Sequence, residues 1–173
     1  MKEKTFKYKD IPKFTECGNY HIHVSLGYVN CLINRYLKYG LQLNPDFQRG
    51  HVWTKSKQIK YMEFLLSGGY SGRDIYFNCP GWMSTFEGDM VLVDGLQRLT
   101  AALKFMDNRL KVYGHYLAEY DRISRNSVGF EFYINNLKTR REVLTWYIQL
   151  NEGGVIHSKK EIDRVKELLK REG

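Results

Sequence analysis

The sequence is poor in the features that mark secreted, disulfide-bonded or membrane-spanning proteins. Its 173 residues include three cysteines, Cys17, Cys31 and Cys79, and no two of them form a C-x-x-C pair. An odd number of scattered cysteines argues against a disulfide framework or a zinc site and favours a reducing compartment. Every apolar run is far shorter than the roughly 20 residues of a membrane span, and residues 1–4 begin no apolar signal core. We therefore expect a cytoplasmic protein with no membrane partner.

Several familiar catalytic signatures are also missing. The Walker A pattern G-x-x-x-x-G-K-[ST] does not occur, which excludes a P-loop. No H-N-H type nuclease constellation and no Ser-His-Asp or Cys-His arrangement can be traced. His21 and His23 share one face of a predicted strand but lack a third ligand at metal-binding spacing. His51 is an acid–base candidate through its closeness in sequence to Arg49.

Positive charge is abundant and unevenly distributed. The formal net charge is +8, and residues 1–60 hold 11 Lys and Arg against 4 Asp and Glu. Such a balance favours polyanionic partners, namely nucleic acid, nucleotides or an acidic membrane surface, although a solvated basic surface that aids solubility gives the same count. Aromatic residues make up 14% of the chain, and they serve either as core or as platforms for bases, core being their commoner use.

Patterns of helical and strand period alternate irregularly along the chain. Apolar residues spaced by three or four predict helices, and short apolar or alternating runs predict strands. Gly40 and Gly68 are typical helix ends, and Thr54 is a suitable N-cap. Helices are predicted over residues 25–39, from Thr54 to Gly68, from Leu96 to Met106, over 139–150 and from the capping box at Ser158 onward, and strands over 20–24, 41–43, 74–78, 90–93 and 129–134.

This mixture favours a single α+β domain with a small mixed sheet and surrounding helices. A doubly wound sheet would need more regular βα units, and 173 residues are too few for two domains. We assign residues 1–18 to a basic N-terminal arm and 19–173 to the domain. The helix positions expected to be buried are Leu26, Val29, Leu32 or Ile33, and Tyr36 or Leu37, then Ile59, Met62 and Leu66, then Leu96, Leu99, Leu103 and Met106.

The most informative segment runs from a buried strand through Asp94 and Gly95 into a helix. The first turn of a helix leaves backbone N–H groups unpaired and carries partial positive charge, so a phosphate bound there gains hydrogen bonds from the backbone and from Arg98. Gly95 would let the backbone approach the ligand closely. Asp94 could orient Arg98, hold Mg²⁺ or contact a ribose hydroxyl. The plain alternative is a helix start that Asp94 caps, with Arg98 in solvent.

Two further polar clusters are candidates for the same site. Arg49 lies on a loop flanked by proline and glycine just before a predicted helix start, where it can meet an anion or form a surface ion pair. Near the C-terminus, Asn151 and Gly153 belong to a Gly-rich loop that opens the last helix. Ser158 could also reach a ligand, but it fits the N-cap of that helix.

Together, the segments NPDFQRGHVW, VDGLQRLTA and LNEGGVIHSKKE resemble the N-terminal domain of GmrSD-type modification-dependent restriction enzymes. That family carries a DGQQR signature and is placed in the ParB/sulfiredoxin-like superfamily. The resemblance spans residues 41–161 and implies a ParB-like α+β fold with a nucleotide pocket. It also implies a link to nucleoside-triphosphate hydrolysis and to DNA restriction.

The resemblance assigns roles residue by residue. Arg49 and Arg98 would neutralise phosphates, and Asp94 or Gln97 would position water or a metal ion, here Mg²⁺. The catalytic candidates are therefore Asp94, Gln97 and Arg98, and the phosphate-binding candidates are Gln48, Arg49, Gly95, Arg98, Asn151 and Gly153.

Two departures from the family pattern shape the expected function. Leu96 stands where the signature has its first Gln, so hydrolysis can be lost while binding survives. No HNH domain occurs before Gly173, so nuclease activity by that chemistry is not expected. We expect a nucleotide-binding protein, with Mg²⁺-dependent triphosphatase activity as its enzymatic form. The alternatives are a non-catalytic DNA-binding or regulatory module of a bacterium, phage or mobile element, and an adaptor that binds a host protein.

Overall fold

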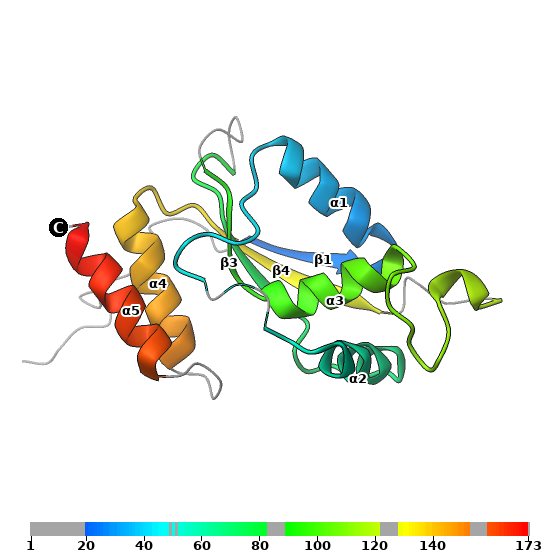
Figure 1. Ribbon diagram of the computed structural model, residues 1–173. Helices are drawn as coiled ribbons and strands as arrows, with labels where there is room; N and C mark the ends of the chain where they lie inside the picture. Colours follow the sequence, from blue (N-terminus) through cyan, green and yellow to red (C-terminus); the bar gives the residue numbers. More distant parts are fainter. Residues whose placement is uncertain are drawn as a thin grey trace, which may run out of the picture.

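The computed structural model of the protein describes residues 20–48, 50, 52–82, 89–121, 128–152 and 159–172. Its described residues form one α+β domain, as predicted (Figure 1). The predicted arm over residues 1–18 lies outside this part of the chain. The elements are β1 (Tyr20–Ser25), α1 (Leu26–Lys38), α2 (Lys55–Leu66), β2 (Asp74–Asn78), β3 (Val91–Asp94), α3 (Leu96–Met106), the 3-10 helix η2 (Leu117–Glu119), β4 (Gly129–Asn135), α4 (Arg140–Glu152) and α5 (Lys159–Arg171).

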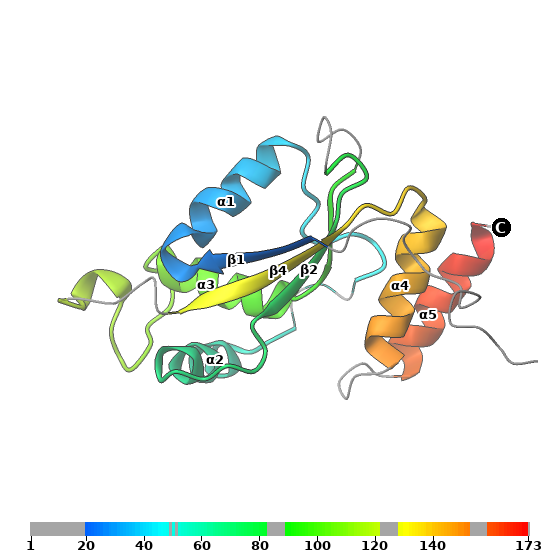
Figure 2. The ribbon, with the colours of Figure 1, turned by 180° about the vertical axis from the view of Figure 1, so that it is seen from behind.

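The four strands form a mixed sheet in the order β1-β4-β2-β3. β2 and β4 run parallel, whereas β1 pairs with β4 and β3 pairs with β2 in antiparallel fashion. Helices α1 and α3 cover one face of the sheet, and the view from behind shows the strands in front of them (Figure 2). The mixed strand directions rule out a doubly wound sheet, in agreement with the irregular sequence pattern.

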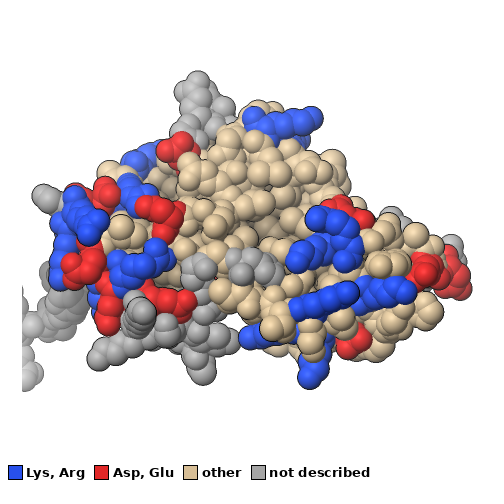
Figure 3. All heavy atoms as spheres, in the orientation of Figure 1, with Lys and Arg blue, Asp and Glu red and all other residues tan. Residues whose placement is uncertain are grey.

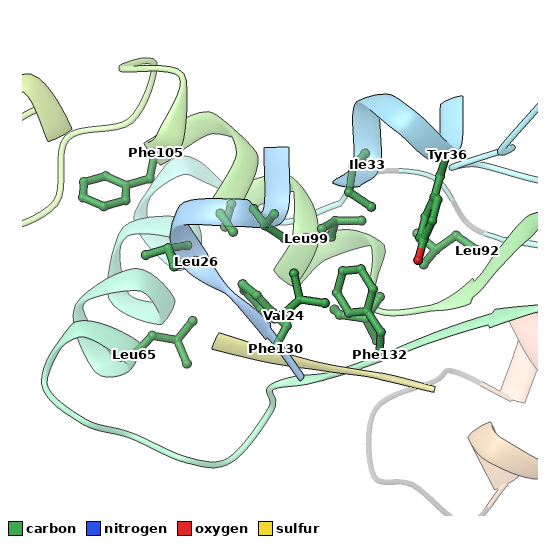
Figure 4. Close-up of a cluster of buried hydrophobic side chains, with 14 of the residues drawn as sticks. Val24, Leu26, Ile33, Tyr36, Leu65, Leu92, Leu99, Phe105, Phe130 and Phe132 are labelled. Carbon is green, nitrogen blue, oxygen red and sulfur yellow. The ribbon is translucent and has the colours of Figure 1, made fainter. Parts of the chain in front are cut away.

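A first hydrophobic cluster lies between this sheet face and helices α1, α2 and α3 (Figure 4). The stripe predicted for α1 is confirmed, since its buried residues are Leu26, Val29, Ile33 and Tyr36. The stripes predicted for α2 and α3 also face this cluster: Met62 and Leu99 are buried, and the other predicted positions are partly buried against it, namely Ile59, Leu66, Leu96, Leu103 and Met106. The helices bury further residues that were not predicted, Gln58 and Leu65 in α2, and Ala101, Ala102 and Phe105 in α3.

The additional buried positions follow from helix packing. α3 contacts α1, α2 and β2, and α2 contacts α3, so α3 is covered on more than one side. Ala101 and Ala102 are small enough for a close approach, and both are fully buried. A single apolar stripe assumes one neighbour and misses this arrangement.

A second hydrophobic cluster lies at the other end of the sheet, around α4 and α5. Val93 of β3, Leu144 and Tyr147 of α4, and Val165 of α5 are buried there. The same cluster contains Phe47, whose ring meets that of Tyr147 edge-on at 5.2 Å. A loop residue from the first half of the chain is therefore part of the C-terminal cluster.

The helix ends show the predicted chemistry in most places. Gly40 adopts φ +86° just after α1, and the hydroxyl of Thr54 accepts from the N–H of Lys57 at 3.3 Å. The strand expected over 41–43 is reduced to a single bridge between Gln42 and Val91. The capping box predicted at Ser158 lies outside the described residues.

A capping box that the sequence pattern also contains, but that was not predicted, begins α4. Thr139 and Glu142 have the Thr-x-x-Glu spacing, and the Glu142 carboxylate accepts from the Thr139 N–H at 2.8 Å and from its hydroxyl at 2.9 Å. In return, the Glu142 N–H donates to the Thr139 hydroxyl at 3.2 Å. These hydrogen bonds hold the pKa of Glu142 below its ordinary value.

Two remaining expectations concern the membrane and the redox environment. Within the described part of the chain, none of the helices combines the length and the apolar character that crossing a bilayer requires. Cys31 and Cys79 are free thiols, the first exposed and the second buried, and burial raises the pKa of Cys79.

Candidate phosphate-binding site

The turn between β3 and α3 has a backbone that glycine alone accepts easily. Gly95 comes directly after the last residue of β3, Asp94, and adopts the left-handed φ of +104°. A Cβ at Gly95 would lie 2.6 Å from Cδ1 of Ile75. The close approach that glycine permits here is thus to the neighbouring strand β2, whereas the sequence led us to expect that it serves a ligand.

The start of α3 lacks a side-chain cap. Gly95 is its N-cap residue and the first turn contains no acidic side chain. The first helical hydrogen bond runs from the N–H of Leu99 to the carbonyl of Gly95 at 2.9 Å. In the described part of the chain, the N–H groups of residues 96–98 have no hydrogen-bond partner. Such unpaired donors, with the helix dipole behind them, favour an anion.

Arg98 and Asp94 form an ion pair beside this helix start. Nη2 of Arg98 donates to Oδ2 of Asp94 at 2.8 Å, and the two side chains are 24% and 32% exposed. Nε of Arg98 is buried and has no partner among the described residues. Burial raises the pKa of the nearby Tyr61, and Arg98 opposes that rise. Asp94 therefore binds Arg98 instead of capping the helix, and Arg98 is not free in solvent.

Gln97 holds the loop that precedes α2. Its Oε1 accepts from the backbone N–H of Val52 at 3.0 Å and of Trp53 at 2.9 Å, and its Nε2 donates to the carbonyl of Gly50 at 2.7 Å. The side-chain amide thus bonds a segment 44 to 47 residues away. Gln97 therefore positions this loop, and its predicted part in orienting water stays a prediction.

The preceding part of that loop is held by β3 and by the C-terminal helices. Nε2 of Gln48 donates to the carbonyl of Leu92. Arg140 of α4 bonds both carboxylate oxygens of Asp46 at 2.9 and 2.8 Å, and Arg164 of α5 donates to backbone carbonyls of the same segment. Sequence reasoning missed Arg140 and Arg164, because no local pattern signals a partner about a hundred residues away.

Arg49 and His51 lie outside the described residues. The expected meeting of Arg49 with Arg98 is therefore a prediction that stays open. The described neighbours on either side, Gln48 and Gly50, are both tied to the β3–α3 unit, through Leu92 and Gln97 respectively.

Comparison with known proteins agrees with this arrangement of motifs. The family model described as the N-terminal domain of GmrSD restriction endonuclease matches residues 30–170. The chain belongs to this family. The resemblance carried by the three sequence segments is confirmed, and it relates the chain to restriction systems. No curated protein and no solved structure matches the chain.

Two further positions of the GmrSD-type pattern make contacts within the protein, and the predicted ligand role of Asn151 stays a prediction. Leu96, which replaces the first Gln of the signature, packs partly buried against the first hydrophobic cluster. Asn151 lies in the last turn of α4, where its Nδ2 donates to the carbonyl of Tyr147 at 2.6 Å. Asn151 makes no hydrogen bond to the α3 start within the described residues. Gly153 is outside those residues.

A cavity of about 330 Å³ lies away from the start of α3, between the sheet edge and the start of α4. Its lining includes Asn78, Val91, Lys138 and Arg140, and includes neither Asp94 nor Arg98. The described residues contain no group of three or more His, Cys, Asp or Glu suited to a metal ion.

A small polar cluster on β1 and β4 also lies apart from the candidate site. His21 and His23 bond Glu131 at 2.5 and 2.7 Å. Burial works against the charge of Glu131, but the bonds from His23 and His21 outweigh it and hold the pKa of that carboxyl below its ordinary value.

Proposed function

We propose that the chain binds the phosphates of a nucleoside triphosphate at the start of α3. The observation that carries the proposal is the set of unpaired N–H groups at residues 96–98, next to the guanidinium group of Arg98. These donors are fixed before any ligand arrives, so they bind an anion without reorganising. Gly50, Val52 and Trp53 of the motif loop, each bonded to Gln97, border the same place.

Asp94 limits the form of the ligand that fits. A carboxylate beside the helix start repels a bare phosphate, and its pairing with Arg98 offsets that repulsion in part. Mg²⁺ is commonly held by one or two carboxylates together with the phosphates of a nucleotide. A single carboxylate therefore suits Mg²⁺ that arrives with the triphosphate, and the metal would supply further neutralisation of phosphate charge.

The experiment is calorimetry of the purified chain with each nucleoside triphosphate and Mg²⁺, and then measurement of released phosphate. Binding to the unmodified chain is expected, with hydrolysis as a second readout. Arg98→Ala should abolish binding, measured at a temperature where the variant is fully folded, because the side chain is only 24% exposed and its loss also removes the ion pair with Asp94. Arg171→Ala, at an exposed position in the last turn of α5, is the matched control and should bind normally.

Absence of binding by the unmodified chain to all four nucleotides would reject the proposal. Equal binding by Arg98→Ala would reject this site. Restoring the signature with Leu96→Gln should raise hydrolysis if its replacement by leucine is what limits turnover.

A second candidate function, duplex DNA binding, is favoured by the surface of α2. Lys55, Lys57 and Lys60 are exposed, and none of them has an ion-pair partner in the described part of the chain. Lys57 lies over the ring of Trp53 at 5.1 Å. Figure 3 shows Lys and Arg gathered over α2 and α3, whereas basic and acidic side chains alternate at the α4–α5 end. Unpaired lysines of this kind suit a phosphate backbone.

The salt dependence of DNA affinity separates this function from nucleotide binding. The logarithm of DNA affinity falls with the logarithm of salt concentration, and each lost phosphate contact makes that fall less steep by about 0.9. Lys60→Gln should show that loss, and Lys38→Gln, at an exposed position of α1, should not. A flat salt response of the unmodified chain would exclude DNA binding by this surface.

A further inference from the structure

Arg164 of α5 directs its guanidinium group at the backbone of a distant segment. Nη1 donates to the carbonyl oxygen of Asp46 at 2.7 Å, and Nη2 donates to those of Phe47 at 2.7 Å and Gln48 at 3.1 Å. No carboxylate forms an ion pair with Arg164 among the residues that the structure describes. A rigid planar fork that meets three consecutive carbonyls fits one backbone conformation and disfavours others.

The same segment has anchors that do not depend on Arg164. The ring of Phe47 is buried in the second cluster against Tyr147, and Gln48 bonds the carbonyl of Leu92 in β3. Asp46 is tied to Arg140. These contacts hold the segment against the rest of the protein without Arg164. What Arg164 adds is the orientation of the three peptide groups whose carbonyls it binds.

Those peptide groups come directly before Arg49, a predicted phosphate ligand that lies outside the described residues. Three bonds from Gln97, in the family signature, hold the far side of the loop at Gly50, Val52 and Trp53. The loop is therefore set from two sides, by α5 before Arg49 and by α3 after it.

We infer that Arg164 is a positioning residue for the proposed phosphate site. It orients the backbone of residues 46–48, the stretch that leads toward Gly50, and Gly50 is held by Gln97 of α3. The inference rests on the proposed function. A displacement of about 1 Å in a positioning element costs as much as about 100-fold in an enzyme's performance, so an exposed residue on α5 can affect ligand binding strongly.

The test compares nucleotide binding by three variants of the full chain with Mg²⁺-ATP, GTP, CTP or UTP, whichever the unmodified chain binds. Arg164→Ala should weaken binding at least tenfold, measured at a temperature where the protein is fully folded. Arg164→Lys keeps the charge but cannot bridge three carbonyls, so it should recover part of the affinity. Arg171→Ala, on the same helix, should bind within twofold of the unmodified chain.

A second readout distinguishes positioning from general stability. A saturating nucleotide should raise the melting temperature of the unmodified chain and of Arg171→Ala, and should raise that of Arg164→Ala much less. Failure of the unmodified chain to bind any nucleotide would remove the proposed function. If the unmodified chain binds a nucleotide and folded Arg164→Ala binds it equally well, the inference about Arg164 is wrong and the proposed function still stands. Should Arg164→Ala not fold, equal affinity of Arg164→Lys and the unmodified chain would overturn it.

Discussion

The sheet with α1 to α3 and the pair formed by α4 and α5 are two regions with different construction. The first encloses 24 buried hydrophobic residues among its described residues, and the second encloses ten. In the first, strands and helices cover each other on several sides. In the second, α4 packs on β3 and α5 packs on α4, so α5 reaches the rest of the protein mainly through α4 and through the loop that Arg164 holds.

This contrast explains the place of the candidate site. The start of α3 belongs to the larger region, whereas the described residues of the loop before α2 are held partly by each region, Phe47 by α5 and Gly50 by α3. In a site built from both regions, the part held by the sheet should be more rigid than the part held by the helix pair. Small regions with few buried contacts open more readily than large ones, so the helix pair is the part whose loss should affect the loop first.

The largest expected effect comes from Phe47→Ala. Removing a buried phenylalanine costs about 3–5 kcal/mol, and Phe47 is 2% exposed. Hydrogen exchange should rise in α4, α5 and residues 45–48 before it rises in α1 to α3. Phe105→Ala, the same deletion in the first cluster, should raise exchange throughout. Identical exchange patterns for the two variants would show that the regions unfold as one unit.

Gly95→Ala should lower the free energy of unfolding by about 2–4 kcal/mol, from left-handed strain and from overpacking against Ile75. Gly68 is the matched control, because it has φ +90° with no atom within 4 Å of an added Cβ. Gly68→Ala should show the strain alone, about 1–2 kcal/mol. Urea unfolding measures both, and equal losses would argue against the close approach to β2.

Thr139→Ala should lower the free energy of unfolding by about 1 kcal/mol, because it removes the N-cap of α4.

The pKa of Glu142 is lowered in the folded state. Its contribution to stability is therefore present above its ordinary pKa of 4.5 and is lost as the pH falls through the folded-state value. Unfolding measured between pH 7 and pH 3 should therefore show a smaller acid loss in Glu142→Gln. An unchanged acid profile would contradict this role.

The smallest effect should come from Arg140→Ala. Arg140 joins Asp46 and Glu172 at 2.8 and 2.9 Å, but its side chain is 40% exposed, so the loss should stay below about 1 kcal/mol. The difference from the unmodified chain should shrink in 1 M salt, where screening is strong. A loss that salt does not change would point to packing by the side chain's methylene groups.

The elements of the fold could largely be predicted because each leaves a local trace. The stripe of α1, the glycine after it and the strand before Asp94 all lie within a residue or two of their predicted positions. The capping box at Thr139 has the same kind of local trace, although it was not predicted. The buried faces of α2 and α3 were harder, since they depend on how closely two helices approach each other, which a single helical period does not encode.

For the candidate site, local sequence was enough to predict that a buried strand leads through Asp94 and Gly95 into a helix. The pairing of Asp94 with Arg98, four residues apart, was one of the roles that the sequence allowed. Only the folded chain shows that Gln97 holds the loop before α2 and that Arg164 reaches the backbone of residues 46–48. The difference comes from the separation of the interacting residues along the chain. Helix starts and left-handed turns depend on neighbours in the chain, whereas these loop contacts depend on where packing places segments 44 to 118 residues apart.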